Sequence, residues 1–279
     1  MANKTNKAEI KSNSSKEPIM PLWKWFALFI LAITLSKIGY SPLINYVTFP
    51  PLYLIGGAAL LALYALGVRI IEKKPAKDVK LNRLLPDLSM GFVLGGVFFL
   101  IVIGVMVIFN ICYFVPSTFT RKALLNIFLF HFAIAVGEEM IFRGVIFRWI
   151  DERWNTTIAL IVSSLLFGLM HLSNSAVTIW IALALTVEAG LLFGAAYKYS
   201  GTLWFPIGIH WAWNFVHANI FGFSAYKKNT IFHPIIKGPD FITGGSFGIE
   251  ASIITVIIGL AFSIELLHRS TLKNSNLKE

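Results

Sequence analysis

Two adjacent glutamates and an arginine lie within one strongly apolar stretch of the chain, residues 124–147. If this stretch crosses a bilayer, an ionised side chain at its centre costs on the order of 3 kcal/mol on insertion scales. Glu139 and Arg143 are one helical turn apart with the glutamate first, the order that favours an ion pair. Glu138 points about 100° away around the helix. We therefore expect Arg143 to neutralise Glu139 and leave Glu138 available for chemistry. The competing interpretation, that all three only join helices, does not explain the second glutamate.

Histidine and asparagine side chains occupy two further apolar stretches. His171 ends residues 157–172, whereas His210 and Asn214 lie one turn apart on one face within residues 203–222. Counted from the expected helix ends at 1.5 Å per residue, these groups and Glu138 all lie about 13–21 Å deep. Each group alone is a common structural feature of membrane bundles. Together, a carboxylate base, two imidazoles and an amide donor suit the hydrolysis of a carbonyl group.

The composition is that of a polytopic membrane protein. Of the 279 residues, 56% are hydrophobic and 14% charged, against about 25% charged in soluble domains. Apolar runs of about twenty residues match the ~30 Å thickness of a hydrocarbon core. We expect an all-α bundle of about eight transmembrane helices, in one domain over 21–270 with its polar motifs in 124–222. Polar tails, 1–20 (disordered) and 271–279, flank it. The expected spans are 22–40, 51–71, 87–112, 124–147, 157–172, 176–197, 203–222 and 249–268.

The basic residues indicate a membrane orientation rather than a nucleic-acid partner. The formal charge is +10, but lysines and arginines are spread between the apolar runs, where they set topology and contact anionic lipid headgroups. With the N-terminus in the cytoplasm, 17 of the 24 basic residues lie inside and 6 outside, with Arg143 within a span. The lone Cys112 excludes a disulfide framework within the chain.

Three spaced motifs resemble those of a known family. Glu138-Glu139-x-x-x-Arg143, Phe167-x-x-x-His171 and His210-x-x-x-Asn214 follow one another on successive expected helices. In this order they resemble the CPBP (CAAX protease and bacteriocin-processing) family of intramembrane proteases. That family includes type II CAAX prenyl endopeptidases and bacterial relatives linked to bacteriocin processing and self-immunity. The resemblance covers residues 120–222 directly.

The resemblance implies a role for each motif residue. Glu138 would activate a water molecule with help from His171, while His210 and Asn214 would polarise the scissile carbonyl and hold its oxyanion. Glu139 and Arg143 would support them. Glu138, His171 and His210 could also supply the three ligands of an open zinc site, although the chain has no His-Glu-x-x-His helix. We favour a metal-independent mechanism, because Asn214 beside His210 looks more like an oxyanion donor pair than a metal site.

The expected function is therefore an intramembrane endopeptidase acting on membrane-associated peptides or proteins. The Lys-, Asn-, Ile- and Phe-rich composition fits the plasma membrane of an AT-rich bacterium, where peptide maturation, export or bacteriocin immunity is a better expectation than cleavage of prenylated CAAX proteins. Two alternatives remain open: a non-catalytic scaffold or immunity protein of the same fold, and a small-solute transporter, for which internal repeats are missing. Glu188 is expected either to support the pocket or to join helices, His217 to pack or to contact headgroups, and His131 to have no function.

Both termini are predicted to face the cytoplasm, because this orientation satisfies the positive-inside rule. Reporter fusions at Lys77 and at the C-terminus should both report cytoplasm, and fusions near Lys237 the opposite side. A C-terminus on the outer side would overturn the number of spans.

Overall fold

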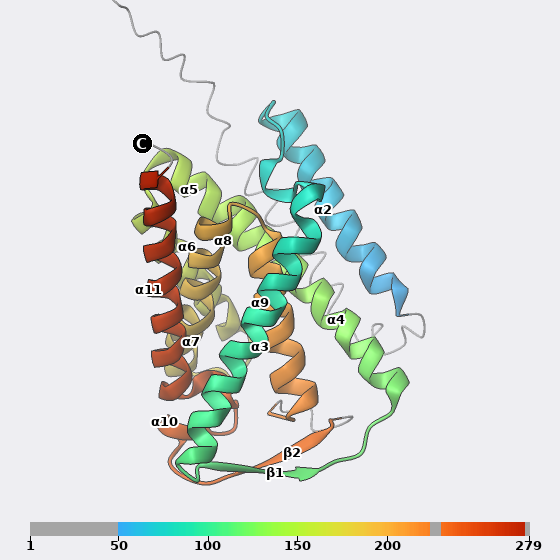
Figure 1. The fold of residues 1–279 in the computed structure, drawn as a ribbon, viewed down its shortest axis with the longest axis vertical. Coiled ribbons are helices and arrows are strands. Elements are labelled where there is room, and N and C mark those ends of the chain that lie inside the picture. Colours follow the sequence, from blue (N-terminus) through green and yellow to red (C-terminus); the bar gives the residue numbers. More distant parts are fainter. Residues whose placement is uncertain (1–49, 224–229, 277–279) are drawn as a thin grey trace, which may run out of the picture.

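The computed structural model describes residues 50–223 and 230–276, which form a bundle of helices (Figure 1). Several bundle helices are continued by π-helical turns, namely η4 (Met140–Phe147), η6 (Thr186–Leu191) and η7 (Val216–Ile220). Short 3-10 turns are η2 (Lys77–Val79), η3 (Leu81–Arg83), η5 (His171–Ser173) and η8 (Ile249–Ala251). The α-helices are α2 (Pro51–Ile71), α3 (Leu84–Ile108), α4 (Arg121–Glu139), α5 (Arg148–Arg153), α6 (Thr156–Met170), α7 (Ile179–Leu185), α8 (Leu192–Ser200), α9 (Trp204–Phe215), α10 (Asp240–Thr243) and α11 (Ile253–Asn276).

The helices confirm a polytopic helical membrane protein. Within the described residues, six helical stretches are long and apolar enough to cross a bilayer: Pro51–Ile71, Leu81–Ile108, Arg121–Arg153, Thr156–Ser173, Ile179–Ser200 and Ile253–Lys273. Each corresponds to a predicted span. The predicted span at 203–222 forms α9 and η7, a shorter stretch that is packed inside the bundle. The predicted tail 1–20 and first span 22–40 lie outside the described residues.

A small sheet adds to the predicted all-helical fold. Strands β1 (Cys112–Pro116) and β2 (Phe232–Ile236) pair antiparallel, with Phe114 opposite Pro234. Helix α3 ends at Ile108, before the predicted end of that span at 112, because Asn110 takes a left-handed conformation (φ 54°) that a helix does not tolerate. Burial raises the pKa of the Cys112 thiol to about 11, so this cysteine acts as a packing residue near neutral pH.

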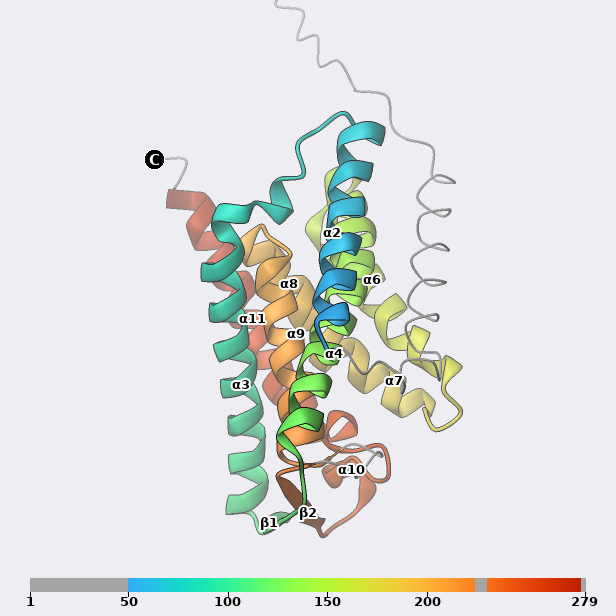
Figure 2. The same cartoon turned by 90° about the vertical axis from the view of Figure 1, so that its right-hand side faces the viewer.

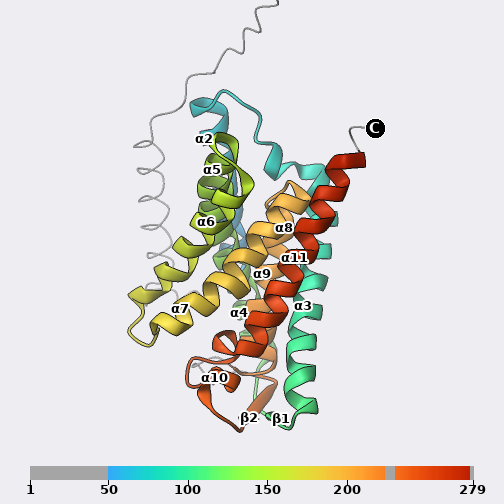
Figure 3. The ribbon, with the colours of Figure 1, turned by 90° about the vertical axis from the view of Figure 1, so that its left-hand side faces the viewer.

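The sheet closes one end of the bundle, and the C-terminal end of α11 lies at the other (Figures 1 and 3). Near that second end, Lys198 pairs with Asp151 at 2.7 Å, and Ser270 donates to the carbonyl of Lys198. Lys198, which the sequence predicts to be inside, therefore lies near the same end of the bundle as the C-terminal end of α11. In the side view, α6 and α7 diverge from α3 and form a separate flank (Figure 2).

Helix α9 is held at the centre by close contact with α3. An added Cβ at Gly91 of α3 would lie 2.2 Å from the Phe205 carbonyl oxygen. One at Gly95 would lie 2.5 Å from the Ile209 carbonyl oxygen. A Cβ at Gly208 would lie 2.3 Å from the Leu88 carbonyl oxygen. Glycine therefore lets the two backbones touch, as small residues do in membrane bundles.

Gly95→Ala and Gly208→Ala should each destabilise the protein by about 1–3 kcal/mol, because the added methyl group forces these backbones apart. Thermal unfolding in detergent measures the effect. Gly96→Ala is the matched control, since nothing lies within 4 Å of its added Cβ. Equal stability of Gly95→Ala and Gly96→Ala would contradict this packing.

Candidate active site

The predicted ion pair between Glu139 and Arg143 is present and fully buried. Glu139 ends α4, and Arg143 lies in the π-helical turn η4 that continues it. Glu139 Oε1 lies 2.9 Å from Arg143 Nη1, and neither side chain is exposed to solvent. A buried charge left without its partner is strongly destabilising, so each of the two residues requires the other.

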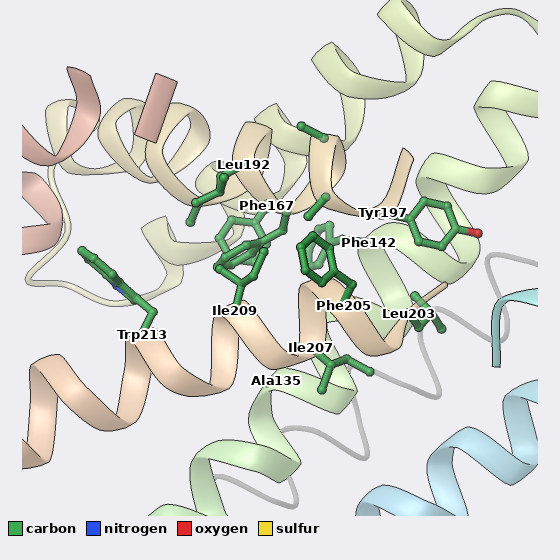
Figure 4. Packing of buried hydrophobic residues seen from close by; sticks show 14 of the residues in the cluster. Ala135, Phe142, Phe167, Leu192, Tyr197, Leu203, Phe205, Ile207, Ile209 and Trp213 are labelled. Carbon is green, nitrogen blue, oxygen red and sulfur yellow. The ribbon is translucent and has the colours of Figure 1, made fainter. Parts of the chain in front are cut away.

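Arg143 also ties this pair to neighbouring helices. Its Nη2 donates to the Gly190 carbonyl oxygen at 2.8 Å, in the π-helical turn η6. Its guanidinium carbon lies 4.9 Å from the ring centre of Phe167 and 5.2 Å from that of Phe193. Aromatic faces stabilise a desolvated cation, so this apolar environment suits arginine. Phe142 and Phe167 lie side by side in the close view of the core (Figure 4).

The imidazole of His210 lies between the two glutamates. Its Nδ1 is 2.9 Å from Glu139 Oε1, and its Nε2 is 3.8 Å from Glu138 Oε2. The ring stacks on Phe193 at 4.7 Å between centres. An ionised carboxylate only accepts hydrogen bonds, so Nδ1 of His210 donates to Glu139 and fixes the orientation of the ring. Glu138 is the more accessible glutamate, with a side chain 12% exposed.

His171 and Asn214 lie around this cluster. His171 follows the end of α6, and its Nδ1 is 2.8 Å from the Phe167 carbonyl oxygen. The centre of the Phe167 ring lies 5.1 Å from that of the His171 ring and 6.2 Å from that of the His210 ring. The Phe167 ring is therefore a shared neighbour of the two histidines. Asn214 is half-buried one turn after His210 on the same face of α9, as predicted.

The sequence allows Glu138, His171 and His210 as the three ligands of a zinc site. Across residues 50–223 and 230–276, no group of three or more histidine, cysteine, aspartate or glutamate side chains is arranged to hold a metal ion. Glu138 and His210 are neighbours, and Nδ1 of His171 lies beside the Phe167 carbonyl oxygen, which leaves Nε2 as the other ring nitrogen of His171.

A second polar cluster lies further along α9 towards the sheet, and sequence reasoning missed it. Glu250 Oε1 accepts a hydrogen bond from Trp213 Nε1 at 3.1 Å and lies 3.4 Å from His217 Nε2. His131 lies in the middle of α4 and hydrogen-bonds Asn219 at 2.8 Å. The spacing of His217 after His210 was visible in the sequence, but the partner from the segment before α11 was not.

The comparisons with known proteins agree with the motifs. Residues 120–216 match the family described as type II CAAX prenyl endopeptidase Rce1-like. Residues 120–216 are therefore an Rce1-like domain. The resemblance predicted from the motifs is confirmed over these residues, and the domain contains Glu138, Glu139, Arg143, His171, His210 and Asn214.

Outside this domain the comparisons are sparse. The chain is 28% identical over 92 residues to the "Uncharacterized protein YpbD" of Bacillus subtilis (strain 168), a match covering 33% of this chain and 43% of that protein. The match thus spans less than half of that relative's length. No solved structure matches the chain significantly. The Rce1-like domain ends before His217 and Glu250, so the second cluster is completed by residues outside it.

Glu139→Gln or Arg143→Met should each destabilise the Rce1-like domain by about 3–5 kcal/mol, because one charge of a buried pair is left alone. Unfolding in detergent measures this loss. Glu265→Gln is the matched control: it breaks an exposed pair of the same spacing with Arg269, worth about 0.2–1 kcal/mol. The double variant Glu139→Gln/Arg143→Met should recover part of the loss, and strictly additive losses would contradict the pairing.

Proposed function

We propose that this protein is an intramembrane endopeptidase that hydrolyses peptide bonds of membrane-associated peptides or proteins. The Rce1-like domain indicates a membrane protease. The observation that carries the proposal is the partly exposed carboxylate of Glu138, which lies 3.8 Å from His210 and next to the buried Glu139–Arg143 pair. A carboxylate within reach of both a water molecule and an imidazole is a suitable general base.

In this proposal, Glu138 takes a proton from water while the water oxygen attacks the scissile carbonyl carbon. The carbonyl oxygen becomes an oxyanion in the tetrahedral intermediate. The carbon–nitrogen bond then breaks, and Glu138 returns its proton to the leaving nitrogen. The products are a carboxylic acid and an amine, and the glutamate is regenerated. His171 would help to orient the attacking water.

In this proposal, His210 and Asn214 stabilise the oxyanion by donating hydrogen bonds to it. The Asn214 amide is a hydrogen-bond donor whatever its environment. His210 can donate from Nε2 only when both ring nitrogens carry protons, because Nδ1 already donates to Glu139. The Glu139 carboxylate then faces the positive ring and stabilises it. Glu139 thereby has two roles: it pairs with Arg143 to stabilise the fold, and it orients and stabilises the His210 ring.

The remaining assignments complete the proposal. The membrane domain extends over residues 21–270, and both termini face the cytoplasm of a bacterial cell. Peptide maturation, export or immunity are the roles that this chemistry would serve. Among the alternatives, a scaffold predicts that the Glu138 carboxylate is dispensable, and a transporter predicts solute flux rather than cleavage.

Glu138→Gln should lower turnover of a membrane peptide by about 10²–10⁴-fold, the usual contribution of a general base, without changing the unfolding temperature. A fluorogenic peptide library assayed in proteoliposomes measures the turnover. Glu265→Gln, an exposed glutamate on α11, is the control for loss of one carboxylate. Near-normal turnover by Glu138→Gln would show that the base is wrongly assigned.

Chelators should leave turnover intact, because in the proposed mechanism Glu138 activates the water, and Asn214 beside His210 suits an oxyanion donor pair. Metal analysis of the purified protein accompanies the assay. The opposite result would be one zinc ion per active monomer, lost together with activity in both His171→Ala and His210→Ala. Such a result would replace the glutamate mechanism while leaving the peptidase in place.

A further inference from the structure

Buried and half-buried carboxylates in this protein commonly lie beside an arginine or a lysine. The distances from carboxylate oxygen to cationic nitrogen are 2.6–2.9 Å in four pairs, which are Asp87 with Arg83, Glu139 with Arg143, Glu72 with Arg148, and Asp151 with Lys198. Such pairing is expected, because a desolvated carboxylate without a cation is unstable in an apolar bundle.

Glu188 and Glu250 depart from this pattern. Within the described residues, neither has an arginine or lysine within 4.0 Å. Glu250 is held by Trp213 and faces His217, and its side chain is 19% exposed. Glu188 is 1% exposed, and its Oε1 has no hydrogen-bond partner among the described residues. The two carboxyl groups are close enough to interact electrostatically. Together they form an acidic site in a protein whose formal charge is +10.

The imidazole of His217, beside these carboxyl groups, also has a ring nitrogen without a hydrogen-bond partner among the described residues. His217 is 7% exposed, and its Nε2 faces Glu250 while its Nδ1 has no hydrogen-bond partner among the described residues. A buried polar atom without a partner is costly unless a ligand or water satisfies it. A donor group that enters from a substrate would satisfy both the carboxylates and this nitrogen.

The acidic site lies at a defined distance from the proposed catalytic residues. His217 lies in η7, seven residues after His210 of α9, which corresponds to about 10 Å along the helix axis. An extended peptide covers about 10 Å in three residues at ~3.3 Å per residue. Figure 4 shows Trp213, which holds Glu250, on α9 beyond Ile209.

We propose that Glu250, Glu188, His217 and Trp213 form a specificity site that binds a lysine or arginine side chain of the substrate about three residues from the scissile bond. This inference rests on the proposed peptidase function. The substrate cation supplies the partner that the described residues do not provide, next to the Glu250 carboxylate that Trp213 holds in place. The substrates are therefore membrane-associated peptides with a basic residue close to the cleavage point.

The test uses the full-length protein in proteoliposomes and a set of otherwise neutral fluorogenic peptides. Each peptide carries a single lysine at one position from four residues before to four residues after the scissile bond, or norleucine at the same position. The wild type should favour lysine over norleucine by about tenfold in kcat/KM at one position about three residues away, the size of a partly desolvated ion pair.

Three variants identify the carboxylates. Glu250→Gln keeps an acceptor for Trp213 and should lose the lysine preference, and Glu188→Gln should reduce it. Glu250→Lys should prefer a glutamate-containing peptide at the same position, a reversal that a merely structural role would not produce. Asp240→Asn removes an exposed carboxylate at the same end of the bundle and should keep the preference of the wild type.

The outcomes separate this inference from the function on which it rests. Cleavage of neutral peptides without a lysine preference at any position, or an unchanged preference in Glu250→Gln, overturns the specificity site alone. If the wild type cleaves no peptide faster than Glu138→Gln does, the proposed peptidase function itself is wrong. A preference that is lost in Glu250→Gln and retained in Asp240→Asn supports the site even if Glu250→Lys does not fold.

Discussion

The arrangement of the polar core depends on one buried ion pair, Glu139 with Arg143. Its two ends contact four other elements: η6 through the Gly190 carbonyl, α9 through His210, and α6 and α8 through the rings of Phe167 and Phe193. Neither charge could be buried alone without a penalty of several kcal/mol. The pair therefore fixes how these helices meet, and the position of His210 beside Glu138 follows from it.

Departures from regular helix geometry make these contacts possible. In η4 the backbone N–H of Arg148 bonds to the carbonyls of Arg143 and Val145 and bypasses that of Gly144. The Gly144 carbonyl instead accepts from the Arg148 side chain at 2.8 Å, with the Tyr64 hydroxyl 2.9 Å away. π-helical turns often mark functional sites, because they release backbone groups and re-aim side chains. Here η4 carries Arg143, η6 supplies its carbonyl acceptor, and η7 carries His217.

Local pattern was enough to predict most of the helices and the Glu139–Arg143 contact. Hydrophobic runs and the four-residue spacing are encoded within single helices, where geometry follows directly from sequence separation. The contact of Glu139 with His210 joins residues 71 positions apart, and no spacing rule reports it. Glu250 was overlooked for the same reason, since its neighbours Trp213 and His217 belong to α9 and η7. The two short strands escaped notice because they lie almost wholly in segments predicted as loops between spans, and their pairing joins distant parts of the chain.

The central claim is that Glu138 acts as a base on water and not as a nucleophile. A single turnover in water enriched in oxygen-18, followed by mass spectrometry of the product and of the enzyme peptide containing Glu138, tests it directly. The account predicts one oxygen-18 atom in the new carboxyl group of the product and none in Glu138. Oxygen-18 in the carboxyl group of Glu138 would reveal a covalent acyl intermediate and would contradict the account.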